Sequence, residues 1–162
     1  MIETTLCYLE QQGCYLMLLR NKKLVDPNKG KWIGVGGKFM PSETPEACAR
    51  REIKEETGFE VRNLQARGIV HFISDEWEDE VMYLFTTSEF TPAPNTPLSD
   101  AGLPLPLCNE GELAWIPIDE VMELKLWEGD RVFLEKIVNG EMNIDLTLRY
   151  EGEKLVEVRA NN

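Results

Sequence analysis

Basic side chains are scarce in this 162-residue sequence. Lysine and arginine number 17 against 29 aspartates and glutamates, which leaves a formal net charge of −12 at pH 7. Proteins that bind nucleic acids or anionic membranes in general need a basic surface. The acidic balance therefore argues against that class of binder, but it allows a small phosphate-bearing ligand whose charge metal ions neutralise.

Cysteine and histidine are also scarce. The four cysteines, Cys7, Cys14, Cys48 and Cys108, show no C-x-x-C spacing, and no histidine lies close to them in sequence. This pattern argues against a structural zinc site and indicates buried thiols of a cytosolic protein. The single histidine, His71, lies in an expected strand, where we assign it a structural or surface role rather than catalysis.

Long apolar runs are absent. No run approaches the roughly 18 residues of a membrane span. The first residues do not combine a basic region with an apolar stretch, so we expect no signal peptide, no membrane association and a cytoplasmic location. Hydrophobic residues make up 43% of the sequence and charged residues 28%, a composition typical of a globular protein, and the length fits a single domain over residues 1–162.

The remaining sequence alternates between strand and helix signals. We expect strands over residues 4–10, 14–20, 68–73, 81–88 and 113–118, and a terminal hairpin over 143–150 and 154–159. Helical spacing covers 128–138, and a short helix fits 118–124. The lysine-rich segment 21–31 and the proline-rich insertion 91–108 are predicted to lack regular structure. The mixture indicates an α/β or α+β sandwich, with one sheet system between helices.

The strongest helix signal follows Thr44. Thr44 is suited to cap the helix, Pro45 to occupy its first position and Gly58 to end it in the left-handed conformation. Ala49 and Ile53, spaced i and i+4, are predicted to anchor one face of this helix to the core.

Another face of the same helix carries three carboxylates. Glu52, Glu55 and Glu56 stand at i, i+3 and i+4 and therefore project together. Carboxylates this crowded repel one another unless a cation lies among them, and Mg²⁺ or Mn²⁺ prefers such oxygen ligands. Arg51 can orient one carboxylate, and the glycine-rich turn before the helix can offer carbonyls to a metal and amides to a phosphate. The alternative is a solvated acidic face.

The spacing of these residues favours the metal site. Between Gly37 and Phe59 the sequence matches G-x5-E-x7-R-E-U-x-E-E-x-G-U, with U an apolar residue, at every fixed position. Seven fixed letters at roughly 7% usage each give a chance match on the order of 10⁻⁸ per starting position. The pattern is the Nudix box, so the chain resembles the Nudix hydrolases. The resemblance implies an α/β/α sandwich with a mixed sheet and a catalytic loop-helix-loop, acting on a nucleoside diphosphate linked to another moiety.

The resemblance also implies residue roles. The implied ligands of Mg²⁺, or of Mn²⁺ in its place, are Glu52, Glu55, Glu56 and a carbonyl around Gly36 or Gly37. The other implied roles are orientation of a catalytic carboxylate by Arg51, a tie between loop and helix through Glu43, a helix end at Gly58 and a phosphate contact by Lys38. For Lys38, a solvated loop position is the alternative.

The general base is left open by the resemblance. In this family a metal-activated water attacks phosphorus, and the base is a glutamate of the box or one from a later loop. Glu55 and Glu56 lie in the box, and Glu110 or Glu112 follows the proline-rich insertion. For the latter two, an ordinary solvated acid is the alternative.

Outside the box the chain is similar to the MutT and 8-oxo-dGTP diphosphatase branch. Residues 31–38 resemble the strand that enters the box there, and residues 126–130 lie where such enzymes carry a tryptophan followed by paired acids. The resemblance implies that Trp127 stacks on the base and Asp130 reads its edge. Gly129 replaces one acid, and Ile33 replaces an asparagine that contacts the purine. A core position is the alternative for Trp127, as we expect for Trp32 and Trp115, while Trp77 is expected to be exposed near the cleft.

The expected function is Mg²⁺-dependent hydrolysis of a nucleoside triphosphate to monophosphate and pyrophosphate, with oxidised purines such as 8-oxo-dGTP as substrates. Alternatives are another Nudix substrate (ADP-ribose, a nucleotide sugar or an RNA 5′ end), a non-catalytic nucleotide sensor, or an interaction module. RNA would require a basic entrance, for which the candidates are Arg20, Lys22, Lys23, Lys29 and Lys31. The expected partner is a small nucleotide without stable nucleic-acid binding, and the chain is expected to be a monomer or homodimer.

Overall fold

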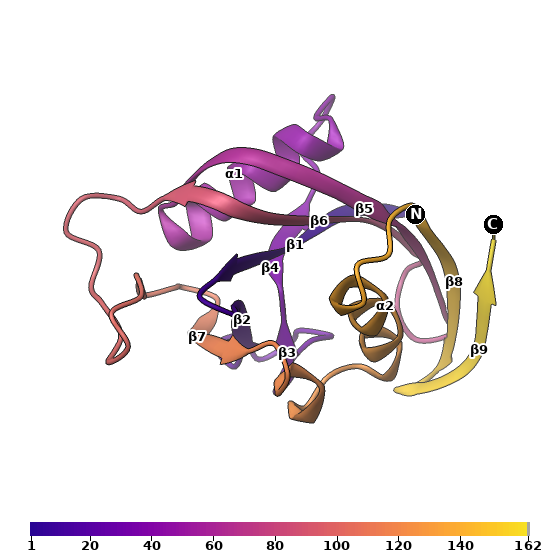
Figure 1. Ribbon diagram of the computed structural model, residues 1–162. Coiled ribbons are helices and arrows are strands. Elements are labelled where there is room, and N and C mark those ends of the chain that lie inside the picture. The colour runs from indigo at the N-terminus through magenta and orange to yellow at the C-terminus, as the bar shows by residue number, and fades with distance from the viewer. Residues whose placement is uncertain (162) are drawn as a thin grey trace.

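The strands form one mixed β-sheet system with an α-helix on each side (Figure 1). The computed structural model describes residues 1–161. The strands are β1 (Ile2–Gln11), β2 (Cys14–Arg20), β3 (Trp32–Ile33), β4 (Val35–Lys38), β5 (Glu60–Ser74), β6 (Glu80–Thr91), β7 (Gly111–Pro117), β8 (Ile144–Glu151) and β9 (Lys154–Ala160). The helices are α1 (Pro45–Thr57), the short 3₁₀ helix η1 (Val121–Glu123) and α2 (Glu128–Val138).

The strand order is β3-β2-β1-β6-β5-β8-β9, with β4 also paired to β1 and β7 to β2. β1 runs parallel to β6, and β5 runs parallel to β8. The other pairings are antiparallel. This mixed sheet between helices is the expected α/β arrangement.

The core lies on both faces of β1. Residues 4–9 of this strand are all buried, the pattern of a strand covered on both sides. α1 packs against β1, β4 and β5, whereas α2 contacts β8 and β9 on the opposite side (Figure 1). Phe133, Leu134 and Ile137 of α2 are buried. The two helices therefore close the sheet from opposite faces.

Helix α1 begins and ends as its sequence predicts. The Thr44 hydroxyl accepts a hydrogen bond from the Ala47 amide at 3.2 Å, and Pro45 is the first helical residue. Gly58 ends the helix with φ of +78°. Ala49 and Ile53 are buried, so the predicted anchoring face is confirmed.

Two elements differ from expectation. β5 begins at Glu60, eight residues before the expected 68, because irregular pairing with β6 carries the hairpin outward as far as the Glu60–Thr91 pair. The helix expected over 118–124 is only the single 3₁₀ turn of η1. The insertion after β6 has no helix or extended strand, as predicted, and its bridge joins Leu98 to Pro104.

The scarce residue types lie as expected. All four cysteines are free, and Cys7, Cys48 and Cys108 are buried. His71 lies on β5 with its Nε2 atom 4.0 Å from a carboxylate oxygen of Asp145. Among residues 1–161, no helix has the length and apolarity needed to span a membrane.

The tryptophans divide between core and surface. Trp32 and Trp115 are partly buried and pack against the core. Trp77 is 38% exposed and lines the cleft described below, which confirms its expected place.

Candidate active site

One face of the sheet forms the floor of a cleft of about 600 Å³. Because side chains alternate along a strand, the parallel pairs Ile2–Glu80 and Thr4–Met82 of β1 and β6 put all four side chains on one face. All four line the cleft. Residues of the glycine-rich turn, α1 and α2 line the same cleft, so it joins the Nudix-box glutamates to the predicted base-binding residues.

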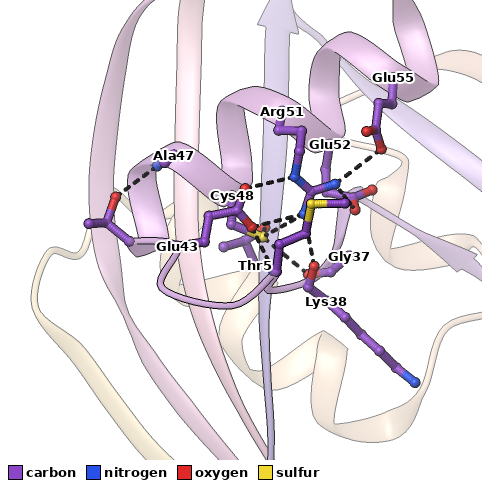
Figure 2. Close-up of polar contacts among 11 residues, drawn as sticks. Thr5, Gly37, Lys38, Glu43, Ala47, Cys48, Arg51, Glu52 and Glu55 are labelled. Atoms are coloured by element: carbon purple, nitrogen blue, oxygen red, sulfur yellow. Dashed lines mark hydrogen bonds and ion pairs between the residues drawn. The ribbon is translucent and has the colours of Figure 1, made fainter.

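Arg51 is the centre of the loop-helix-loop (Figure 2). Its guanidinium donates hydrogen bonds to both carboxylate oxygens of Glu43, at 2.7 and 2.9 Å. It also reaches Glu52 at 2.8 Å, Glu55 at 3.1 Å and the Lys38 carbonyl at 3.0 Å. The Arg51 guanidinium therefore positions three carboxylates and the end of β4, which precedes the loop.

Glu43 ties the loop to the helix, the role the resemblance implies for it. Its Oε1 atom accepts from the Met40 amide at 2.9 Å in addition to the Arg51 bonds. The Arg51 hydrogen bond, together with the Met40 amide, lowers the pKa of Glu43 to about 2. Glu43 is therefore ionised throughout the physiological range, and the loop is closed by a charge-assisted pair.

Gly37 is where the loop and the helix lie closest. A Cβ atom on Gly37 would lie 2.5 Å from the Glu52 carboxyl carbon, closer than any side chain tolerates. The Gly37 carbonyl accepts a weak hydrogen bond from Cys48 Sγ at 3.6 Å. Only glycine at this position lets the Glu52 carboxylate lie against the backbone of the turn.

Glu52 and Glu56 are the two sheltered carboxylates of the box. Burial raises the pKa of Glu52 despite the opposing effect of Arg51. Burial, and then the charge of Glu52, raises the pKa of Glu56 to about 8. The Oε2 atom of Glu56 is buried without a hydrogen-bond partner. An orphaned acceptor beside a second acid is a site for a cation.

Glu55 lies differently from its two neighbours. Its side chain is 55% exposed and is held by Arg51. Within residues 1–161, no three histidine, cysteine or acidic side chains gather closely enough to hold a metal ion. The acids that could bind a cation together in this structure are therefore Glu52 and Glu56, whereas Glu55 is held by Arg51.

Lys38 ends β4 at the edge of the cleft. It is exposed and lines the cleft, and its side chain extends away from the Arg51 network (Figure 2). The ammonium group is thus available to an anion in the cleft.

Of the two later acids, only Glu110 lines the cleft. Its carboxylate lies 3.0 Å from Lys23 Nζ and 3.4 Å from the Arg20 guanidinium. Its charge contributes to the raised pKa of Glu56, so the two groups are neighbours. Glu112 is exposed on β7 and is absent from the lining.

Trp127 and Asp130 lie in the cleft at the start of α2. Trp127 is half-buried, and its indole N–H donates to Asn28 Oδ1 at 2.9 Å. Lys31 Nζ lies 4.2 Å from the centre of the indole, and Tyr150 meets it edge-on. Asp130 is only 6% exposed. Burial, then the charge of Glu80, raises the pKa of Asp130 to about 8.

Sequence reasoning missed four residues around Trp127 and Asp130: Asn28, Lys31, Glu80 and Tyr150. They come from a loop, the start of β6 and β8. These residues become neighbours only through the order of the strands in the sheet, so no spacing within the sequence marks them as a group. Glu80 is also the last acid of the run between the strands expected over 68–73 and 81–88, and nothing in that run marks it as part of a site.

The lysine-rich loop does not present free charges to the cleft. Arg20 binds Asp26 at 2.9 Å, and Lys22 donates to the Cys108 carbonyl at 2.8 Å. Lys31 pairs with Glu153. With Lys23 on Glu110, four of the five candidate basic residues are already paired.

Comparison with known proteins identifies the family of this chain. The NUDIX domain family model matches residues 4–137. An uncharacterised Nudix hydrolase of Bacillus subtilis, YvcI, is 26% identical over 153 residues, which cover 92% of this chain and 87% of that protein. The oxidized purine nucleoside triphosphate hydrolase of Danio rerio is 30% identical over 127 residues, covering 78% of this chain and 72% of that protein.

A solved structure extends the likeness to the whole fold. The crystal structure of the MutT protein from Bacillus halodurans superimposes with a TM-score of 0.82 at 25% identity, covering 99% of this chain and 98% of that chain. The Nudix fold and the MutT-like relationship expected from the sequence are confirmed. With the Nudix box, its arginine-centred loop-helix-loop and a family match over most of its length, the chain belongs to the Nudix hydrolases.

Proposed function

We propose that this Nudix hydrolase converts a nucleoside triphosphate to the monophosphate and pyrophosphate in the presence of Mg²⁺, with oxidised purine nucleotides such as 8-oxo-dGTP preferred. The observation that carries the proposal is the shared cleft: Glu52 and Glu56 line it together with Trp127 and Asp130. The cleft therefore carries acids suited to a cation and phosphates. It also carries an aromatic residue and a buried acid suited to a base, so that one ligand can contact both groups.

The acidic part of the cleft fits a divalent cation. Nudix hydrolases in general use such metals, and here Glu52, Glu56 and the Gly37 carbonyl would hold the ion, with Glu55 adjacent. Two observations support this assignment: the Glu56 Oε2 atom is buried without a hydrogen-bond partner, and the pKa of both acids is raised. A bound cation would pair with that oxygen and favour the charged form of both acids. When bound, Mg²⁺ polarises phosphoryl oxygens and neutralises their charge.

The chain's own residues position the phosphates and the proton acceptor. Lys38 supplies a cation at the cleft edge, and Arg51 holds the box carboxylates in place without being free to bind phosphate itself. Glu110 is our candidate for the group that accepts a proton from the attacking water. Its place beside Glu56, in the cleft, supports it over the exposed Glu112.

The base would lie against Trp127. The hydrogen bond to Asn28 and the edge-on contact with Tyr150 fix the orientation of the indole, which limits the entropy lost when a purine stacks on it. Asp130, buried beside it, offers a carboxyl group to the edge of the base. The Danio rerio relative, named an oxidized purine nucleoside triphosphate hydrolase, supports the same assignment.

A long RNA substrate is less well supported. It would need unpaired basic side chains at the entrance, and Arg20, Lys22, Lys23 and Lys31 are engaged with protein groups. The net charge of −12 also opposes a polyanion.

A substrate panel tests the proposal. It contains 8-oxo-dGTP, 2-hydroxy-dATP, the four normal deoxynucleoside triphosphates, ADP-ribose and a triphosphorylated RNA oligomer, each with Mg²⁺ and with the products resolved by chromatography. We expect the highest kcat/KM with an oxidised purine, and pyrophosphate as a product. Equal rates on all triphosphates, or a preference for ADP-ribose or RNA, would keep the Nudix chemistry and reject the oxidised-purine role.

A further inference from the structure

A second carboxyl group faces Asp130 across the cleft. Glu80, the first residue of β6, lines the cleft on the same sheet face as Thr4 and Met82. Its Oε2 atom accepts a hydrogen bond from the Thr4 hydroxyl at 2.5 Å. The charge of Glu80 acts on Asp130 more strongly than that of Lys31 does. Two acids from distant parts of the sequence therefore approach one space.

Within residues 1–161, at least one oxygen of each carboxyl group has no hydrogen-bond donor. No hydrogen-bond donor reaches the Asp130 side chain within residues 1–161, although the residue is only 6% exposed, and it lines the cleft. Glu80 uses one oxygen for Thr4, which leaves the other for a ligand. Buried polar groups in proteins are almost always hydrogen-bonded. The carboxyl oxygens of Asp130 and Glu80 that lack a donor therefore indicate that a bound molecule supplies the missing hydrogen bonds.

Gly129, the residue next to Asp130 on α2, leaves no room for an acidic side chain at that position. The Gly129 amide donates to the Tyr150 hydroxyl at 2.6 Å. A Cβ atom on Gly129 would lie 2.5 Å from that hydroxyl and 2.7 Å from a methyl carbon of Leu148. Any side chain there would displace both, so a second carboxyl group has to come from another element.

We propose that Glu80 is a specificity residue that contacts the base, where its carboxyl group and that of Asp130 together bind the hydrogen-bonding edge of a purine lying against Trp127. This inference rests on the proposed function. It adds a residue to the base site that the Nudix box and the tryptophan motif do not include.

The chemistry of the pair suits an oxidised purine. Oxidation at C8 converts N7 of guanine from an acceptor into an N–H donor, next to a new carbonyl oxygen. A carboxylate accepts from that N–H but repels the unprotonated N7 of guanine. Two acids in one buried space do not both ionise readily, so the protonated one can donate to a carbonyl while the other accepts.

The surrounding charges set which acid ionises. Lys38 favours the charged form of Glu80, as does the Thr4 hydroxyl, while burial opposes it and raises its pKa. Lys31 favours the charged form of Asp130. The hydroxyls of Tyr8 and Tyr150, whose pKa values Asp130 raises, also face that acid. In the proposed pair Glu80, which already accepts from the Thr4 hydroxyl, is the accepting group, and Asp130, which no donor of the described residues reaches, is the donating group.

Glu80→Gln tests the proposal. The ligands are the reaction products 8-oxo-dGMP and dGMP, titrated calorimetrically without metal, so that the measurement does not depend on catalysis. We expect Glu80→Gln to weaken the binding of 8-oxo-dGMP by about tenfold or more, the effect typical for loss of a hydrogen bond to a charged group. The binding of dGMP should weaken less. The preference for 8-oxo-dGTP over dGTP in kcat/KM should fall by the ratio of these two losses.

Glu78→Gln is the matched control. Glu78 also lines the cleft, but it is exposed and pairs with the amino terminus, so its loss should leave the ratio of the affinities for 8-oxo-dGMP and dGMP unchanged. Glu80→Asp, which keeps the charge on a shorter side chain, guards against a folding defect and should retain part of the preference. An unchanged preference in folded Glu80→Gln, or an equal loss in Glu78→Gln, would overturn the proposal.

Two further variants separate this inference from the proposed function. If Trp127→Ala and Asp130→Ala weaken binding of 8-oxo-dGMP while Glu80→Gln does not, the base site stands and the role of Glu80 fails. If none of the three affects binding of either product, the base lies elsewhere and both ideas fail.

Discussion

The two halves of the cleft are built in opposite ways. The acidic half is local: Glu43, Arg51, Glu52 and Glu55 lie within 13 residues and share one hydrogen-bond network centred on the arginine. The base-binding half draws on β1, β6, α2 and β8, and its acids Glu80 and Asp130 lack a shared partner. In the proposed function, the groups that would bind the cation are thus held by contacts close in sequence, whereas the groups that would select the substrate depend on the arrangement of the whole sheet.

The electrostatics of the two halves also differ. In the acidic half, the hydrogen bond from Arg51, and then that from the Met40 amide, lowers the pKa of Glu43 to about 2. At the other half, no arginine contacts Asp130 within residues 1–161, and burial raises its pKa to about 8. Glu56 belongs to the box but resembles Asp130, because burial, and then the charge of Glu52, raises its pKa to about 8 as well. The distinction predicts which substitutions abolish turnover and which change only selectivity.

The largest expected effect is on the acidic half. Glu56→Gln and Glu52→Gln should each lower kcat by about 10²–10³-fold, the loss typical when one charge-stabilising group leaves an active site. The fold should persist, because glutamine has the same shape. Steady-state kinetics with Mg²⁺, together with thermal unfolding, would measure both quantities.

Glu46→Gln is the control for the helix itself. Glu46 is exposed in the first turn of α1 and pairs with Arg50, so its change should leave kcat intact. Full activity in both Glu52→Gln and Glu56→Gln would contradict the assignment of these residues to a cation.

The second prediction concerns stability and pH at the base-binding half. The usual pKa of an aspartate is 3.8, and burial raises that of Asp130 to about 8 in the folded chain. Between these values the folded chain holds a proton that the unfolded chain has lost, so the unfolding free energy should fall as pH rises. Each unit of pKa difference is worth about 1.4 kcal/mol, which makes the expected loss several kcal/mol.

Asp130→Asn should flatten this slope. Glu56 contributes a slope of the same sign, so the variant retains part of it. Denaturant unfolding without metal at pH 5 and pH 8 would measure the difference, with the exposed Asp119→Asn as control. A wild-type stability that rises across this range would show that Asp130 ionises freely and that the two halves are electrostatically alike.

Sequence reasoning succeeded where the information is local. Thr44, Pro45 and Gly58 mark the ends of α1 because capping needs only a few neighbouring residues. The contacts of Arg51 follow from the spacing of the box. Glu80 could not be predicted, because its partner Thr4 is 76 residues away and is reached through the parallel pairing of β1 with β6. An acid that ends an acidic turn carries no local mark of burial.

The third prediction is the stacking energy. Trp127→Ala should raise KM for purine triphosphates by about 5–150-fold with a smaller change in kcat, since base stacking on an aromatic side chain is worth about 1–3 kcal/mol. Trp127→Phe, which keeps an aromatic face, should recover much of the loss. An unchanged KM in Trp127→Ala would make the indole a packing residue for Tyr150 alone.

The smallest expected effect is on the orientation of the indole. Asn28 Oδ1 accepts from the Trp127 N–H at 2.9 Å, and a neutral hydrogen bond of this kind contributes about 0.5–1.5 kcal/mol. Asn28→Ala should therefore raise KM for purine triphosphates by about 2–12-fold while kcat is retained. Asn28→Asp keeps an acceptor oxygen at the same position and should resemble the wild type.

A double variant shows whether Asn28 acts only through Trp127. Asn28 belongs to the loop between β2 and β3, where its backbone amide donates a 3.0 Å hydrogen bond to the Asp26 carboxylate. If the loop acts only through the indole, Asn28→Ala has no further effect once Trp127 is already alanine, and the double variant matches Trp127→Ala. Additive losses would mean that the loop contacts the nucleotide directly. In that case even the base-binding half would include a determinant local in sequence, and the contrast with the acidic half would be weaker than the sheet order indicates.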